Sequence, residues 1–202
     1  MPARPKWFAW IDLETNGLDP RDNPILEVGM VVTPTSIPFN EIATYESAVE
    51  PSSDQHPTWR DDMDSFVVKM HTVNGLLLDI ESGNGASIRR VEKEMIEVLA
   101  DFGRPHQFML AGSGVGHFDA RFLQAQMPEF YKWLQYPCLD VGVIRRAFSF
   151  SGRRDLDKYG STFSSRGGKP HRGLADVQDH LAEFRAYAQI FSNIPTPVPH
   201  ES

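Results

Sequence analysis

The chain has 202 residues, 41% of them hydrophobic, and a formal net charge of −7, which is typical of one globular domain with a real core. The acidic balance argues against a protein held to long nucleic acid by a broad basic surface. The single cysteine, Cys138, excludes an internal disulfide, and no signal core or membrane span is evident, so we expect a cytoplasmic protein without a membrane anchor.

The first fifty residues show the pattern of three strands. An apolar run over residues 8–11 indicates a buried strand that stops at Asp12-Leu13-Glu14. Turn-prone residues 16–24 then precede a second predicted strand at 25–33, and a third is expected over 43–49. We therefore expect the chain to begin as a β-meander.

Helical periodicity begins later in the chain. Apolar residues three and four apart predict a helix over residues 57–70, followed by a break at 71–75. A second helix is predicted from an N-cap at Ser87 to Phe102. A short strand at 107–111 then leads through a glycine-rich connection, residues 112–116, into a helix that starts near His117.

The remaining elements are a short strand over 138–140, a helix that ends near Phe148, and a final helix over 173–191. Residues 149–170 are rich in Ser, Gly and Arg and lack periodicity, which predicts a mobile loop. We assign residues 1–192 to one domain and 193–202 to a flexible tail. Strands followed by alternating helices and strands predict an α/β fold, with one mixed sheet flanked by α-helices.

Asp12 and Glu14 form the first patch with chemical potential. Side chains alternate along a strand, so both carboxylates point to the same face. Neighbouring carboxylates repel each other unless a cation or a proton separates them, and oxygen ligands suit hard ions such as Mg²⁺. The alternative is a strand whose polar end simply meets solvent.

Two further patches contain the remaining candidates. Asp119 is expected in the first turn of a helix, where an acid is also common because of the helix dipole. His171 and Asp176 have the spacing H-x-x-x-x-D, with His171 before the last helix and Asp176 about one turn inside it. A fixed carboxylate suits a metal ligand, whereas a histidine on a loop suits a proton acceptor. Alone, this pair could equally be a surface histidine and a first-turn acid.

Together the order D-x-E, D and H-x-x-x-x-D resembles the DEDDh exonucleases of the RNase H-like superfamily. The segments WIDLETNGLDP, MHTVNGL, MPEFYKWLQYPCLDV and HRGLADVQDHLAEF are similar in order and spacing to the oligoribonuclease branch, and the resemblance covers residues 7–188. It implies an RNase H-like fold and 3′-to-5′ release of nucleoside 5′-monophosphates from short single-stranded RNA. It also implies two Mg²⁺ or Mn²⁺ ions and a homodimer.

The resemblance further implies roles for single residues. The ligands of the two ions would be Asp12, Glu14, Asp119 and Asp176. His171 would be the general base, Leu18 would wedge between two bases, and Phe66 would stack on a base. His71 and Tyr136 would reach the 5′ phosphate, Tyr136 from across the dimer interface. Without the resemblance, Leu18 and Phe66 read as core residues and Tyr136 as an aromatic residue of a strand.

The chain departs from the oligoribonuclease pattern where that family caps the 5′ phosphate. A serine, an arginine and a second serine are replaced by Gly114, Pro137 and Gly142, whose side chains cannot donate hydrogen bonds. We therefore expect an open cleft and a weak preference for dinucleotides, unless Lys169 or Arg172 supplies the missing cation. The segment GHFDARFL is more similar to proofreading exonucleases, so single-stranded DNA is an alternative substrate. A non-catalytic nucleic-acid-binding module and a nucleotide phosphohydrolase are alternatives of other classes.

Overall fold

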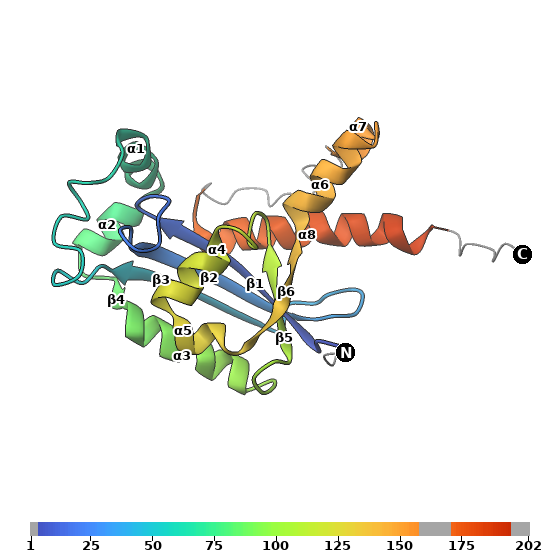
Figure 1. Ribbon diagram of the computed structural model, residues 1–202, viewed down its shortest axis with the longest axis horizontal. Coiled ribbons are helices and arrows are strands. Elements are labelled where there is room, and N and C mark those ends of the chain that lie inside the picture. Colours follow the sequence, from blue (N-terminus) through green and yellow to red (C-terminus); the bar gives the residue numbers. More distant parts are fainter. Residues whose placement is uncertain (1–3, 158–170, 195–202) are drawn as a thin grey trace, which may run out of the picture.

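The computed structural model describes residues 4–157 and 171–194, in which six strands form one mixed sheet of order β4-β3-β2-β1-β5-β6 (Figure 1). The strands are β1 (Trp7–Thr15), β2 (Ile25–Pro34), β3 (Ala43–Glu50), β4 (Ala86–Ser87), β5 (Phe108–Gly112) and β6 (Leu134–Asp140). Strands β1, β2 and β3 pair antiparallel, which confirms the predicted meander, whereas β5 and β6 continue the sheet in parallel.

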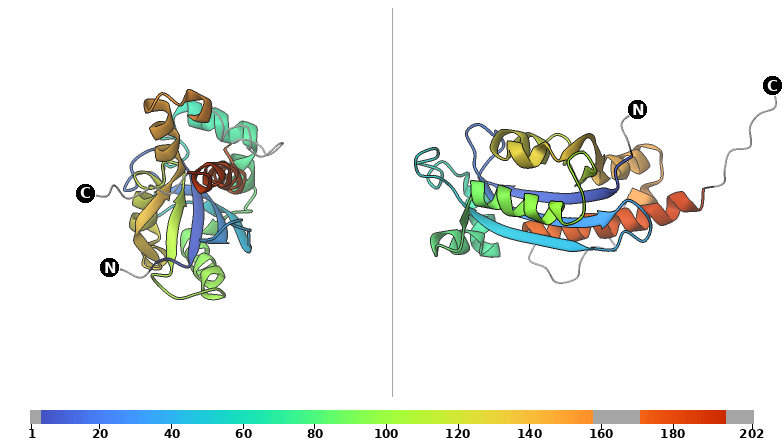
Figure 2. Two further views of the ribbon diagram at one scale, coloured as in Figure 1. Left: turned by 90° about the vertical axis from the view of Figure 1, so that its right-hand side faces the viewer. Right: turned by 90° about the horizontal axis from the view of Figure 1, so that it is seen from below.

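Helices pack on both faces of this sheet (Figure 2). The helices are α1 (Ser65–Asn74), α2 (Leu76–Glu81), α3 (Ile88–Ala100), α4 (Asp119–Gln126), α5 (Pro128–Tyr131), α6 (Val141–Phe150), α7 (Arg154–Asp157) and α8 (Gly173–Ser192). The predicted mixed sheet flanked by helices is therefore confirmed. None of the helices in the described ranges combines the length and apolarity that crossing a bilayer demands.

Alternation along β1 divides its side chains between two cores. Ala9, Ile11 and Leu13 pack in the core that contains side chains of α3 and α4. Phe8 and Trp10 pack in the other core, with side chains of α8. Because the period of a strand is two residues, Asp12 and Glu14 continue the second series and face α8. The prediction that they share a face follows from this pattern.

Several predicted boundaries were wrong. The helix expected over residues 57–70 begins at Ser65, because the Asp64 side chain accepts a hydrogen bond from the Phe66 N–H and acts as its N-cap. The helix then runs through most of the expected break to Asn74, where Gly75, with φ 89°, ends it and α2 begins. The short helices α2 and α5 were not predicted.

The second half of the chain also differs from the sequence-based boundaries. Strand β6 starts at Leu134 rather than at Cys138; its Pro137 is tolerated because β6 is an edge strand. Within the segment predicted as a loop over 149–170, α6 extends to Phe150 and α7 covers Arg154–Asp157. Residues 158–170, and 195–202 of the predicted tail, lie outside the described residues.

Candidate active site

Two glycines bring the start of α8 onto the middle of the sheet. A Cβ atom at Gly29 of β2 would lie 2.0 Å from the backbone carbonyl carbon of Gly173, and one at Gly173 would lie 2.6 Å from the Gly29 nitrogen. Backbone can approach backbone this closely only when both residues lack a side chain. The contact is fastened by the Gly173 N–H, which donates to the buried Glu27 carboxylate at 2.8 Å. Asp176, in the first turn of α8, is thereby held against β1.

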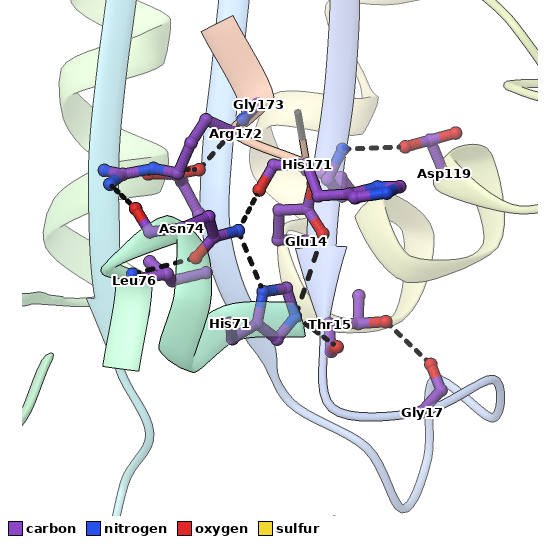
Figure 3. A network of polar contacts seen from close by, with 12 residues as sticks. Glu14, Thr15, Gly17, His71, Asn74, Leu76, Asp119, His171, Arg172 and Gly173 are labelled. Carbon is purple, nitrogen blue, oxygen red and sulfur yellow. Dashed lines mark hydrogen bonds and ion pairs between the residues drawn. The ribbon is translucent and has the colours of Figure 1, made fainter. Parts of the chain in front are cut away.

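The five residues predicted to perform catalysis come from β1, α4 and the start of α8. Ligand atoms of Glu14, His171 and Asp176 all lie within 4.8 Å of one another. Asp119, at the first position of α4, accepts the Leu13 N–H at 3.0 Å, which ties this helix to β1 beside Asp12 (Figure 3). The structure therefore brings together side chains that are up to 164 positions apart in the sequence.

Burial and mutual repulsion raise the pKa values of these carboxyl groups. Burial is the main cause at Asp12, whose pKa lies well above its usual value, and Asp119 and Glu14 raise it further. Burial, followed by the charge of Asp176, raises the pKa of Glu14 to about 8. Burial also raises the pKa of Asp119 to about 7 and that of Asp176 above its usual value. Without a cation, these carboxyl groups ionise only at raised pH. Their clustered oxygen atoms fit divalent cations, which remove the repulsion between the ionised groups.

His71 lies directly behind Glu14. The ring is fully buried, with Nε2 3.4 Å from the Thr15 carbonyl oxygen and 3.8 Å from Glu14 Oε2. Its Nδ1 lies 3.4 Å from the side-chain nitrogen of Asn74. Burial lowers the pKa of His71, which favours the neutral ring. Contact with a 5′ phosphate stays a prediction, and it would require this ring to leave its protein partners.

The other residues predicted to contact substrate are exposed. Leu18 is 77% exposed, Phe66 68% and Tyr136 99%, so the alternative reading of Leu18 and Phe66 as core residues is wrong. These large side chains face solvent at positions where the family resemblance predicts contact with bases, so they are available for stacking.

The loop that carries Leu18 is braced rather than loose. The Gln126 amide of α4 donates to the carbonyl oxygens of Pro20 and Asn23, at 2.9 and 2.8 Å, and accepts the Ile25 N–H at 3.1 Å. Three hydrogen bonds from one side chain therefore fix the connection between β1 and β2. Leu18 projects from a rigid support, as a wedge requires.

The glycines at the positions of the family's phosphate cap differ in the space around them. At Gly114, with φ 77°, an added Cβ would meet only a His117 carbon at 3.9 Å, so the space is open. At Gly142 it would lie 3.0 Å from Ser113 Oγ and 3.1 Å from Asp140 Oδ1, so the expectation of open space is wrong there.

Arg172 is not free to replace the missing cap cation. Its guanidinium lies 2.7 Å from Glu27 Oε1 and 3.1 Å from Asp79 Oδ2, so its hydrogen-bonding capacity is directed at these acids. Lys169, the other suggested cation, lies outside the described residues.

Sequence reasoning missed three residues around the site: Glu27, Asn74 and His180. Glu27 is the single charged residue within the strand ILEVGMVVTP, and that exception in an apolar run was the available signal. His180 lies one helical turn beyond Asp176, with Nδ1 4.0 Å from Asp12 Oδ1 and without a hydrogen-bond partner among the described residues. Asn74 lies in the segment MHTVNGL, but no pattern there assigned this residue a role.

Comparisons with known proteins bear on the family and the fold of this chain. A family model described as exonuclease, of the RNase T type, matches residues 9–184. The oligoribonuclease of Idiomarina loihiensis is 30% identical over 184 residues, which cover 91% of this chain and 93% of that protein. The nuclease domain of 3′hExo, a DEDDh family member bound to rAMP, superposes with a TM-score of 0.61 at 17% identity, covering 98% and 99% of the two chains.

A second solved structure has the same fold in a longer protein. Zinc-bound Escherichia coli ExoI in complex with single-stranded DNA superposes with a TM-score of 0.69 at 13% identity. The superposition covers 94% of this chain and 42% of the ExoI chain. At this identity the likeness concerns the fold alone.

Proposed function

The chain belongs to the RNase T exonuclease family and is a 3′-to-5′ exonuclease of its DEDDh type, and we propose that its substrate is short single-stranded RNA, from which it releases nucleoside 5′-monophosphates. The observation that supports a hydrolytic role is the convergence of Asp12, Glu14, Asp119, Asp176 and His171 at one acidic site. The choice of short RNA is supported by the likeness to oligoribonucleases. A pure binding module would gain nothing from clustered negative charge beside a polyanion, which argues against the non-catalytic alternative.

We assign the binding of two Mg²⁺ or Mn²⁺ ions to Asp12, Glu14, Asp119 and Asp176. Such ions, when bound, supply charge stabilisation for the attacking and leaving oxygens of a phosphodiester. His171, which precedes α8 and faces Glu14 and Asp176, would accept the proton of the attacking water. The acids are fixed by β1, α4 and α8, so the chain's own contribution is to hold water, phosphate and base in one orientation.

Substrate binding would use the exposed side chains around this site. In the proposal Leu18 separates two bases, Phe66 stacks on one of them, and Tyr136 contributes at the 5′ end. His71 is buried, so it would reach the 5′ phosphate only after leaving its protein partners. Tyr136 lies on the edge strand β6, next to α6, which exposes Val143 and Phe150. These apolar groups support a homodimer in which Tyr136 reaches the partner's site. Sedimentation of a fully active monomer of 22.8 kDa at micromolar concentration would contradict the dimer.

The absence of the phosphate cap leads to a testable expectation about substrate length. Each hydrogen bond to a charged group contributes about 1.5–3 kcal/mol. Losing two would cost at least about 3 kcal/mol and lower the affinity for a 5′-phosphorylated dinucleotide by about a hundredfold or more. We expect comparable rates on pGpG and on a seven-nucleotide RNA. A hundredfold preference for the dinucleotide would show that other residues have rebuilt the cap.

A single experiment distinguishes RNA from the alternative, single-stranded DNA. Product analysis on matched 5′-labelled RNA and DNA oligomers of graded length, with Mg²⁺ or Mn²⁺, gives the preferred sugar, the length preference and the direction of cleavage together. Faster release from RNA supports the proposal, and faster release from DNA at every length would overturn it in favour of the alternative.

A further inference from the structure

Asn74, the last residue of α1, is a buried amide placed between the two histidines of the site (Figure 3). Its side-chain nitrogen donates to the backbone carbonyl of His171 and lies 3.4 Å from His71 Nδ1. Its side-chain oxygen accepts the N–H of Leu76, the first residue of α2, at 3.0 Å. One side chain therefore connects the helix pair α1–α2 with the segment that carries His171.

The contact with His71 selects one form of that ring. An amide –NH₂ group can only donate, so the Nδ1 atom that it faces is the acceptor. In the neutral ring the proton is then on Nε2. Nε2 is the atom that faces the Thr15 carbonyl oxygen and Glu14 Oε2. Asn74 thus directs an N–H group toward the end of β1.

The contact with His171 acts on an unusual backbone. His171 has φ 60°, in the left-handed region that residues with a side chain rarely occupy. Such a conformation persists only when its surroundings determine it. The neighbouring residues are held by Glu27, which accepts the Gly173 N–H and the Arg172 side chain. The hydrogen bond from Asn74 fixes the carbonyl of His171 itself.

We propose that Asn74 is a positioning residue, whose buried amide holds the His171 backbone and the His71 ring so that the base is presented to the acidic site. This inference rests on the proposed function, since it takes His171 to be the proton acceptor. Asn74 touches no reacting atom and acts through the two histidines.

The matched substitution is Asn74→Asp. An aspartate has the same shape and still accepts the Leu76 N–H, but it has no N–H group to offer to His171 or His71. We expect kcat to fall about tenfold or more with little change in KM, the scale typical of groups that orient a site residue. Thr72→Ala is the control, because Thr72 is exposed on the same helix and, among the described residues, its hydroxyl bonds only to the Val68 carbonyl oxygen. An Asn74→Asp enzyme with the parent's kcat would overturn the inference.

A double-mutant cycle separates positioning from general damage. If Asn74 acts through the base, Asn74→Asp should lower kcat less than about threefold when His171→Ala is already present, because coupled residues are not additive. The same full loss in both backgrounds would overturn the inference, since a structural defect does not depend on His171.

A spectroscopic measurement needs no activity. Long-range ¹H–¹⁵N correlation spectra of the histidine rings, recorded near pH 8 with His71 identified by His71→Gln, report which nitrogen carries the proton. We expect the Nε2–H form in the parent and its loss in Asn74→Asp. A parent ring protonated on Nδ1 would overturn the inference. Absence of nuclease activity in the parent would instead refute the proposed function, with the spectrum still testing the Asn74 contact.

Discussion

At the scale of single residues, the site consists of carboxyl groups that are hard to ionise, because the fold buries them and places them close together. Asp12 and Glu14 alternate along β1, so burial and repulsion act on neighbouring carboxyl groups of one face. Asp119 is held by the Leu13 N–H and His171 by Asn74, so each group is oriented by a partner from another element. The consequence is a site prepared for positive charge before any cation arrives.

Replacing Asp12 tests the metal assignment. Asp12→Asn should lower turnover in Mg²⁺ at least about a hundredfold, because an amide is a poor substitute for a carboxylate ligand. The metal-free protein should unfold at the same or a higher temperature, since the substitution removes a carboxyl group that repels its neighbours in the site. Asp101→Asn, at an exposed position after α3, is the control. Turnover within tenfold of the parent would refute the assignment.

Replacing His171 tests the proposed base. His171→Ala should lower kcat about 10²- to 10⁴-fold, the usual contribution of a general base, with little effect on oligonucleotide binding. Single-turnover rates and binding of a labelled oligomer are measured separately. His106→Gln, at an exposed histidine before β5, controls for loss of an imidazole. A loss confined to binding would show that His171 positions the substrate.

At the scale of elements, the decisive contact is that between β2 and α8. The pairing of Asp12 with Gly29 across β1 and β2 places a residue without a side chain under the start of α8. The close approach of Gly29 and Gly173 then sets the height of the whole helix above the sheet. Asp176 reaches the acids of β1 because of this contact, and helical geometry alone would not bring it there.

Gly29→Ala tests this contact. The new methyl group would overlap the backbone of Gly173, which cannot move aside as a flexible side chain could. We expect a loss of about 1–3 kcal/mol in the free energy of unfolding, as in other overpacked cores, and lower activity of the folded enzyme. Gly83→Ala is the comparison, because its added methyl meets open space and causes only backbone strain. Full activity of Gly29→Ala would mean that α8 does not depend on this approach.

At the scale of the whole molecule, the raised pKa values link stability to pH. Unfolded carboxyl groups are ionised above about pH 5, whereas burial in the metal-free fold raises the pKa of Asp119 to about 7 and that of Glu14 to about 8. Around pH 7–8 the native state therefore binds more protons than the unfolded state, and stability falls as pH rises. His71 and His180 have lowered pKa values and act in the opposite sense, but only near and below pH 6.5, where the unfolded rings gain protons.

We therefore expect the melting temperature of the metal-free protein to fall by several degrees from about pH 7 to about pH 8.5. Mg²⁺ or Mn²⁺ should remove most of this dependence by stabilising the ionised site. Glu14→Gln should flatten the profile without metal. Thermal unfolding with a chelator, at constant ionic strength, provides the measurement. A melting temperature that rises across this window would contradict the raised pKa values.

The sequence by itself determined the features that depend on local periodicity. A strand has a period of two residues, so Asp12 and Glu14 had to share a face wherever β1 packed. Helical spacing likewise placed Asp176 in the first turn of the last helix, with His171 just before that helix. The order of these acids was sufficient for the family resemblance, because the pattern of residue types is carried by the chain itself.

Only the tertiary structure decided which distant groups complete the site. Asn74 lies 97 positions from His171, and Glu27 lies 145 from Arg172, so no local pattern links them. The start of α1 was predicted too early, because the apolar spacing of residues 57–70 begins before the helix does. The Asp64 N-cap makes Ser65 the first helical residue. Periodicity predicts which face of a helix or strand is buried. Which residue of another element contacts that face depends on how the elements pack.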